Sequence, residues 1–186
     1  MDDIRKFKYK KIKNFLSKQE INLLKIYCDI KHRIYSPNKN MTDTQSTDSS
    51  YYGDPAMEAL LLSKHKKMEK LTGLKLFPTY AYWRMYTYGA ILKEHDDRQS
   101  CEISVTVCID KEKIDWPIYI DGTRIDMEPG DAAIYLGCEL KHWREEFKGD
   151  FQAQAFLHYV DQHGPNAEWR ADKRMLFGTK QQTQGG

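Results

Sequence analysis

The order of two hydrophobic periodicities along the chain restricts the fold more than any other feature of the sequence. Apolar residues recur at helical spacing within about 17–32 and 55–71. Beyond about residue 79 the chain changes to short segments that alternate polar and apolar residues, separated by turns rich in Gly, Pro and Asp. Helices followed by many short strands predict an α+β protein in which a barrel or jelly roll is braced by N-terminal helices.

Local signals set the expected boundaries of these elements. Ser17 and Glu20 form a capping box at the start of the first helix, and Gly73 is a stop signal after the second. The polar stretch 36–50 predicts a long loop, and long loops in compact domains tend to be mobile or functional. Strands are expected at 80–86, 102–109, 116–120, 124–127, 132–136 and 151–160.

The length of 186 residues suits one domain with a buried core. We expect this domain at 1–177, with the helical brace at about 14–72 and the β core at about 79–161. The segment 178–186 is polar and rich in Gln and Gly, which predicts a disordered tail.

Composition excludes several classes of partner. A net charge of +2 gives no bulk signal for nucleic acid, and no apolar run approaches the roughly 20 residues that cross a membrane. The basic segment 5–11 is expected to be an edge strand or terminus, with a nucleic-acid arm as the alternative. The N-terminus lacks an apolar signal segment and the four cysteines form no CxxC pair, which predicts a cytoplasmic protein with reduced thiols.

Three residues have the spacing of a metal-binding face. His95 and Asp97 stand two positions apart, so on a strand they point the same way, and His142 comes from a distant segment. Two neutral imidazoles and one hard carboxylate suit a divalent first-row metal. With three coordination positions left open, this is the arrangement used by non-haem iron(II) oxygenases.

Around these residues the chain resembles the iron(II)- and 2-oxoglutarate-dependent oxygenases, specifically their prolyl-4-hydroxylase-like branch. The resemblance covers about residues 79–161, and the preceding helices fit the brace that is usual in the family. The residues that carry it are Tyr86-x-x-Gly89, His95-x-Asp97, the Pro129-Gly130-Asp131 turn and His142.

The resemblance implies a double-stranded β-helix, a jelly-roll or cupin-like fold with a metal at its open end. It implies iron(II) on His95, Asp97 and His142, 2-oxoglutarate as co-substrate, O2 as oxidant and ascorbate as a supportive reductant. The implied enzyme is a dioxygenase that hydroxylates an unactivated C–H bond and releases succinate and CO2. Because Asp97 is present, hydroxylation is favoured over halogenation.

The sequence departs from the family at one position of the closing strand. The resemblance predicts an Arg or Lys there, paired with the distal carboxylate of 2-oxoglutarate, but the aligned residue is Gln152. A neutral amide does not supply the charge-assisted bidentate pair that a guanidinium gives. Arg84 is the first candidate to replace it, because strand alternation directs Arg84 inward together with Tyr86. Arg144, two residues beyond His142, is the second.

Other inward-facing side chains are expected near the co-substrate. Tyr82 shares its strand face with Tyr86, and Gln154 and His158 share the face of Gln152 on the closing strand. Arg98 follows Asp97 and is expected nearer the mouth, where it suits the substrate or a gating loop. An internal ion pair between Arg84 and Glu102 is the alternative to a clamp role for Arg84.

Two other functional classes compete with a hydroxylase of small-molecule or peptidyl substrates. The first is a cupin-like barrel that binds a metal or small ligand without catalysis, supported by the neutral Gln152. The second is a nucleic-acid oxidative demethylase, supported only by the basic N-terminus.

Overall fold

The computed structural model describes residues 3–35 and 49–179 and contains two antiparallel sheets with helices on one side. The six-stranded sheet has the order β1 (Tyr9–Ile12), β8 (Ala132–Leu136), β5 (Ile103–Lys111), β10 (Gln152–Asp161), β3 (Leu76–Tyr86) and β2 (Ser49–Tyr52). The four-stranded sheet has the order β4 (Leu92–His95), β9 (His142–Arg144), β6 (Ile118–Ile120) and β7 (Thr123–Ile125). The predicted double-stranded β-helix with N-terminal helices is confirmed.

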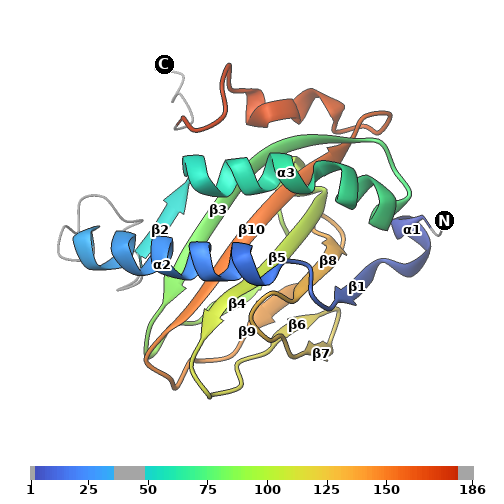
Figure 1. Cartoon of the computed structure of the whole chain (residues 1–186). Helices are drawn as coiled ribbons and strands as arrows, with labels where there is room; N and C mark the ends of the chain where they lie inside the picture. The colour runs from blue at the N-terminus through green and yellow to red at the C-terminus, as the bar shows by residue number, and fades with distance from the viewer. Residues whose placement is uncertain (1–2, 36–48, 180–186) are drawn as a thin grey trace, which may run out of the picture.

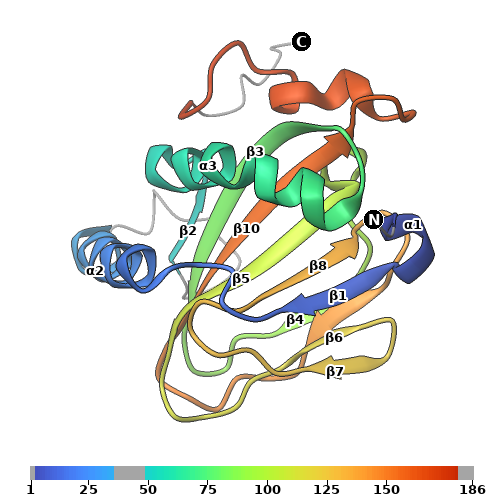
Figure 2. The same cartoon turned by 45° about the vertical axis from the view of Figure 1, so that its right-hand side comes forward.

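Two long helices cover the outer face of the six-stranded sheet. Helices α2 (Lys18–Tyr35) and α3 (Pro55–Thr72) lie across this face, and the four-stranded sheet lies on the opposite side (Figures 1 and 2). Their apolar residues join those of the sheet in one core, which includes Leu24, Met57 and Trp83. The helices therefore brace the sheet from outside and leave the space between the two sheets to other side chains.

The helix ends follow the signals in the sequence. The Ser17 N–H donates to Glu20 Oε2 at 2.8 Å and the Glu20 N–H to Ser17 Oγ at 3.2 Å, so the predicted capping box forms. Asp54 caps α3 by accepting from the backbone of its first turn. Gly73 ends α3 at φ 75°, a left-handed conformation that glycine adopts without steric cost.

Strand alternation divides the residues of β3 between two environments. Ala81, Trp83 and Met85 are buried in the core beneath the helices. Tyr82, Arg84 and Tyr86 alternate with them and line a cavity between the sheets, as the alternation predicts. The hydrophobic core thus fixes the direction of the polar side chains on the other face of the strand.

The structure agrees with the prediction for the basic N-terminal segment and differs in part from the prediction for the loop 36–50. The basic segment is an edge strand, because β1 pairs with β8 alone and Lys11 forms an ion pair with Asp131 at 3.1 Å. The prediction of a loop over 36–50 is wrong at its end, because Ser49–Tyr52 forms β2 and pairs with β3. Residues 36–48 lie outside the described part of the chain.

The remaining elements are short. Helix α1 (Ile4–Phe7) precedes β1, the 3₁₀ turn η2 (Gln99–Cys101) follows Asp97, and η3 (Ala167–Lys173) follows β10. Of the expected tail, Gly178 and Thr179 are described: the Gly178 N–H donates to Glu58, and the Thr179 carbonyl accepts from Arg174. Residues 180–186 lie outside the described part. Within the described ranges, no helix has the length and apolar character needed to span a membrane.

Candidate active site

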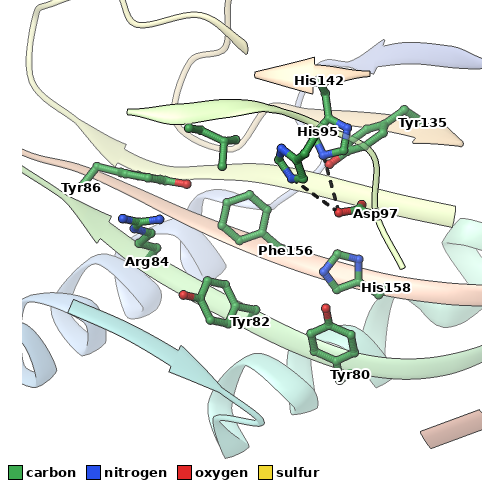
Figure 3. Close-up of a pocket in the computed structure, with 11 residues that line it drawn as sticks. Tyr80, Tyr82, Arg84, Tyr86, His95, Asp97, Tyr135, His142, Phe156 and His158 are labelled. Carbon is green, nitrogen blue, oxygen red and sulfur yellow. Dashed lines mark ion pairs between the residues drawn. The ribbon is translucent and has the colours of Figure 1, made fainter. Parts of the chain in front are cut away.

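The structure brings His95, Asp97 and His142 together at the end of the four-stranded sheet. His95 ends β4, His142 begins β9, and the two residues are paired in register across these strands. Asp97 Oδ1 lies 3.8 Å from His95 Nε2 and 3.6 Å from His142 Nε2, and the three donor atoms lie within 4.8 Å of one another. Figure 3 shows all three side chains pointing to a common centre.

The sequence predicted that His95 and Asp97 lie on the same strand, but in the structure Asp97 lies beyond the end of that strand. Strand β4 ends at His95, so Asp97 belongs to the segment that leads into η2. Its N–H donates to the Gly137 carbonyl at 2.9 Å, and its Oδ2 accepts from Ser104 Oγ at 2.8 Å. A Cβ on Gly137 would lie 2.6 Å from Asp97 Oδ2, so the carboxylate occupies space that only glycine leaves open.

The protonation pattern of the two imidazoles suits metal binding. Nδ1 of His95 lies 2.8 Å from the Lys93 carbonyl, and Nδ1 of His142 lies 2.9 Å from the Leu140 carbonyl. Since a carbonyl oxygen only accepts, both Nδ1 atoms carry the proton and both Nε2 atoms present lone pairs to the centre. Burial by itself would raise the pKa of Asp97, but the neighbouring His142 and His158 and the hydrogen bond from Ser104 outweigh it, so the pKa is lowered and the carboxylate stays ionised.

These donors fit a divalent first-row metal. Metal–nitrogen and metal–oxygen bonds of about 2 Å place neighbouring ligand atoms roughly 3–4 Å apart, which is the spacing found here. Two neutral imidazoles and one carboxylate on one side of the centre are the ligand set of non-haem iron(II) sites, and leave the cavity side open.

A cavity of about 230 Å³ adjoins the three donors between the sheets. It extends from the metal ligands along the inner faces of β3 and β10, where Phe156 lies between the ligands and Arg84 (Figure 3). The remaining lining residues are Tyr80, Tyr82, Tyr86, Leu92, Tyr135 and His158.

The two candidate arginines have different environments. Arg144 is 1% exposed, and its Nε and Nη2 atoms have no hydrogen-bond partner among the described residues. Its third nitrogen, Nη1, donates to the Trp116 carbonyl. The pKa of Arg144 is below its usual value because of burial, although the neighbouring Tyr86, Cys108 and Tyr135 act in the opposite direction. Arg84 is half-buried and lines the cavity. A buried guanidinium with two unpaired nitrogens is costly unless an anion binds it.

The predicted residues of the closing strand β10 face the same interior. Gln152 pairs in register with Tyr86, and Gln154 with Cys108, both of which are neighbours of Arg144. Gln154 Oε1 accepts from Thr106 Oγ1 at 3.3 Å. Gln154 Nε2 and Gln152 Oε1 are buried without a partner among the described residues. Unpaired polar atoms therefore occur on Arg144 and on two residues whose cross-strand partners neighbour it.

His158 lies beside the three candidate ligands His95, Asp97 and His142. Its Nδ1 is 3.0 Å from Ser104 Oγ, and its ring packs against that of Tyr80 at 4.5 Å between centroids, tilted by 34°. Burial lowers the pKa of His158 to about 4, so it is neutral at physiological pH. His158, Asp97 and Cys101 also have donor atoms within 4.8 Å of one another, but burial raises the pKa of the Cys101 thiol to about 12, so it is protonated.

Arg98 does not have the expected position at the mouth of the cavity. Its guanidinium forms two hydrogen bonds to Asp172, at 2.7 and 2.8 Å, and lies over the Tyr80 ring at 4.7 Å. The buried carboxylate of Asp172 holds Arg98 toward η3, and Arg98 is not among the residues that line the cavity, so its catalytic or substrate role stays a prediction. The alternative partner of Arg84, Glu102, instead accepts from the Asp161 backbone at 3.2 Å.

The sequence did not reveal several residues of the site. Tyr135 lines the cavity from β8, but that strand is apolar on both faces and gives no alternation to read. Trp116, before β6, contacts Arg144 through its carbonyl and its ring. Phe156 follows the inward alternation of the closing strand and could have been found from that signal.

Comparison with known proteins adds evidence on the fold. No protein-family model matches this chain, and no curated protein matches it in sequence. A prolyl-4-hydroxylase of Pseudomonas putida superposes with a TM-score of 0.66 at 16% identity, over 86% of this chain and 96% of that one. The viral collagen prolyl hydroxylase vCPH from Paramecium bursaria Chlorella virus-1, with 2-oxoglutarate, gives 0.61 at 15% identity, over 82% and 94%. EctD from S. alaskensis, with 2-oxoglutarate and 5-hydroxyectoine, gives 0.65 at 13% identity, over 83% and 72%.

The chain therefore has the fold of the iron(II)/2-oxoglutarate oxygenases, as the sequence motif predicted. Within that class it is similar to prolyl hydroxylases over nearly their whole length.

Proposed function

We propose that this protein is an iron(II)- and 2-oxoglutarate-dependent dioxygenase that hydroxylates an unactivated C–H bond. The observation that carries the proposal is the convergence of His95, Asp97 and His142 on one centre that borders a cavity. When bound at these residues, iron(II) supplies the redox chemistry that consumes O2 and 2-oxoglutarate and yields succinate, CO2 and a hydroxylated substrate.

The residues of the chain hold and orient this chemistry. The Lys93 and Leu140 carbonyls fix the imidazole rings of His95 and His142, and Ser104 fixes the carboxylate of Asp97. Such outer contacts hold the ligands in place and typically contribute about 10–100-fold to metal affinity. Phe156, Leu92 and Tyr86 supply apolar surface to the walls of the cavity beside the centre.

Arg144 is the proposed partner of the distal carboxylate of 2-oxoglutarate. Its two unpaired nitrogens match a bidentate contact to a carboxylate, and Gln154 Nε2 is an additional buried donor. This arrangement replaces the cation that Gln152 does not supply. The second sequence candidate thus becomes the first, because complete burial makes Arg144 the arginine that most needs an anion.

The substrate is proposed to be a small molecule or a side chain presented at the open end of the cavity. The P. putida and viral structures are named as prolyl hydroxylases, which makes a prolyl group a reasonable first substrate to assay. We also propose a cytoplasmic location, because all four cysteines, each within the described residues, are free.

The test measures binding of iron(II) and 2-oxoglutarate without oxygen, followed by succinate formation in air. We expect a chelate absorption band and slow succinate production in the wild type. Both should be lost in His95→Ala and Asp97→Ala and retained in His163→Ala, which removes an exposed histidine. Arg144→Met should weaken 2-oxoglutarate binding by roughly 30-fold, about 2 kcal/mol. Undiminished iron affinity and turnover in His95→Ala would contradict the proposal.

A metal-binding barrel without catalysis is the second candidate, favoured by the neutral amide of Gln152 on the closing strand. It predicts that iron(II) binds but that anaerobic addition of 2-oxoglutarate produces no chelate band. The same titration therefore separates the two functions.

A further inference from the structure

A second group of possible metal ligands shares Asp97 with the proposed iron site. Donor atoms of Asp97, Cys101 and His158 lie within 4.8 Å of one another. Cys101 belongs to η2, which follows Asp97 in the chain, and His158 belongs to β10. Figure 3 shows the His158 ring between Asp97 and Tyr80. The second group combines a carboxylate, a thiol and an imidazole, so it differs from the first group in having sulfur.

The spacing of the three donors is close to that of a zinc site. Zinc–ligand bonds of about 2.0–2.3 Å place the ligand atoms of one ion roughly 3–4 Å apart. Side-chain shifts of about 1 Å therefore suffice to bring donors within 4.8 Å of one another onto a single ion. Three protein ligands leave the fourth position of a tetrahedral site to water.

Ser104 links two of the three ligands. Its Oγ lies 3.0 Å from His158 Nδ1 and donates to Asp97 Oδ2 at 2.8 Å. Outer contacts of this kind hold the ligands of a metal in place. Since His158 is neutral at physiological pH, one of its ring nitrogens has a lone pair to offer.

Cys101 has a partner for the thiolate form. The Tyr80 hydroxyl lies 3.1 Å from Cys101 Sγ and can donate to it, and Ser100 Oγ lies 3.9 Å away. The thiol is protonated while no metal is bound, but a thiol that coordinates a divalent ion loses its proton outright. Hydrogen bonds to the sulfur then stabilise the anion.

The second group can be reached from the cavity. Asp97 and His158 line it together with Tyr80, whereas Cys101 is 2% exposed. An ion that enters the cavity therefore meets two of the three ligands directly.

The sulfur determines which ion suits each group. Thiolate, imidazole and carboxylate are the usual protein ligands of zinc(II), whereas two imidazoles and one carboxylate suit iron(II). We propose that Asp97, Cys101 and His158 form a zinc site that competes with iron for the Asp97 carboxylate. Zinc would then inhibit the oxygenase from a position distinct from the iron centre, since an ion held there withdraws one of the three iron ligands. The zinc site stands by itself, and its inhibitory effect rests on the proposed function.

The test uses cobalt(II) as a spectroscopic substitute for zinc, because a cobalt–thiolate bond gives a charge-transfer absorption band in the near ultraviolet. Cobalt(II) is titrated anaerobically into the full chain carrying His95→Ala, which disables the first group and leaves the second complete. We expect the band to form in this variant and to disappear when zinc displaces the cobalt.

Matched cysteine variants assign the band to a residue. Added to His95→Ala, Cys101→Ser should remove the band, and Cys108→Ser, at a buried cysteine of β5, should retain it. His158→Gln should weaken cobalt binding by roughly tenfold or more, because even an outer contact contributes about 10–100-fold. This variant keeps the site testable if Cys101→Ser fails to fold.

Competition is measured in chains that keep all three iron ligands. Zinc is titrated into the iron(II)-loaded protein, and the iron that stays bound is measured after gel filtration. We expect Cys101→Ser to need about tenfold more zinc than the wild type for half release, with its iron affinity unchanged. Cys108→Ser should behave as the wild type.

Three results would overturn the inference: no charge-transfer band in His95→Ala, a band that survives Cys101→Ser, or binding of iron and zinc together at one ion of each per chain. Failure of the wild type to bind iron(II) would instead overturn the proposed function and the inhibition with it, while a band that depends on Cys101 would still support the zinc site.

Discussion

The ring of Tyr86 packs edge-on against that of Trp116, with 4.8 Å between centroids, and this contact separates the two arginines of the barrel interior. Arg84 lies over the Tyr86 ring at 4.6 Å, and Arg144 lies over the Trp116 ring at 4.7 Å. The two cations are thus held apart by two aromatic rings.

Trp116→Leu should weaken 2-oxoglutarate binding, because it removes the ring that orients Arg144. We expect a loss of roughly tenfold in affinity together with about 2–4 kcal/mol of stability from the lost packing. Trp143→Leu removes a tryptophan of β9 that stacks outside the barrel on Tyr119 at 5.2 Å, and should leave co-substrate affinity unchanged. Calorimetric titration of 2-oxoglutarate into the metal-loaded variants checks this, and equal affinities would refute the role of Trp116.

Gly137→Ala should impair metal binding without removing any ligand. The added Cβ would lie 2.6 Å from both Asp97 Oδ2 and Ser104 Oγ and would also meet the Cys101 carbonyl. The carboxylate must then shift, and we expect a loss of roughly 10–100-fold in iron(II) affinity. Gly122→Ala is the control, since nothing lies within 4 Å of its Cβ position. Its φ of 75° makes a modest stability loss the expected cost, with metal affinity retained.

Asp172→Asn should loosen the C-terminal segment that contains η3. Asp172 is buried, accepts two hydrogen bonds from Arg98 and one from Tyr52, and lies in a run of three residues with positive φ. We expect a loss of about 1–3 kcal/mol in unfolding free energy, because the strained backbone depends on these bonds. Glu168→Gln, at an exposed ion pair, should cost less than about 1 kcal/mol. Urea unfolding compares the two variants, and equal losses would contradict the prediction.

Acid should destabilise the metal-free protein through His158. Burial lowers its pKa from 6.5 to about 4, so the unfolded chain takes up a proton at a higher pH than the folded one. The stability contributed by neutral His158 is complete above pH 6.5 and is lost as pH falls toward 4. We expect a loss of about 2–3 kcal/mol between roughly pH 7 and pH 4.5. His158→Gln should reduce this dependence, and an unchanged pH profile in urea unfolding would refute the assignment.

The sequence by itself determined most of the helices and strands and singled out the three residues that could hold a metal ion. The capping box at Ser17 and Glu20, the stop at Gly73 and the alternation along β3 and β10 are local, and each has the predicted effect in the structure. The pattern His95-x-Asp97 with His142 could be read as a metal face because the residue types and spacing of such ligands follow from coordination chemistry.

The tertiary structure alone decided where the three candidate arginines lie relative to the cavity. Nothing local distinguishes Arg84, Arg98 and Arg144, since burial depends on strands that are distant in sequence. Asp172 draws Arg98 away from the cavity, and the carbonyl and ring of Trp116 hold Arg144 in the interior. Gly137 makes room for the Asp97 carboxylate from a segment 40 residues away. The positions of these side chains depend on packing between segments that are distant in the sequence. The spacing of residues along the chain therefore does not predict them.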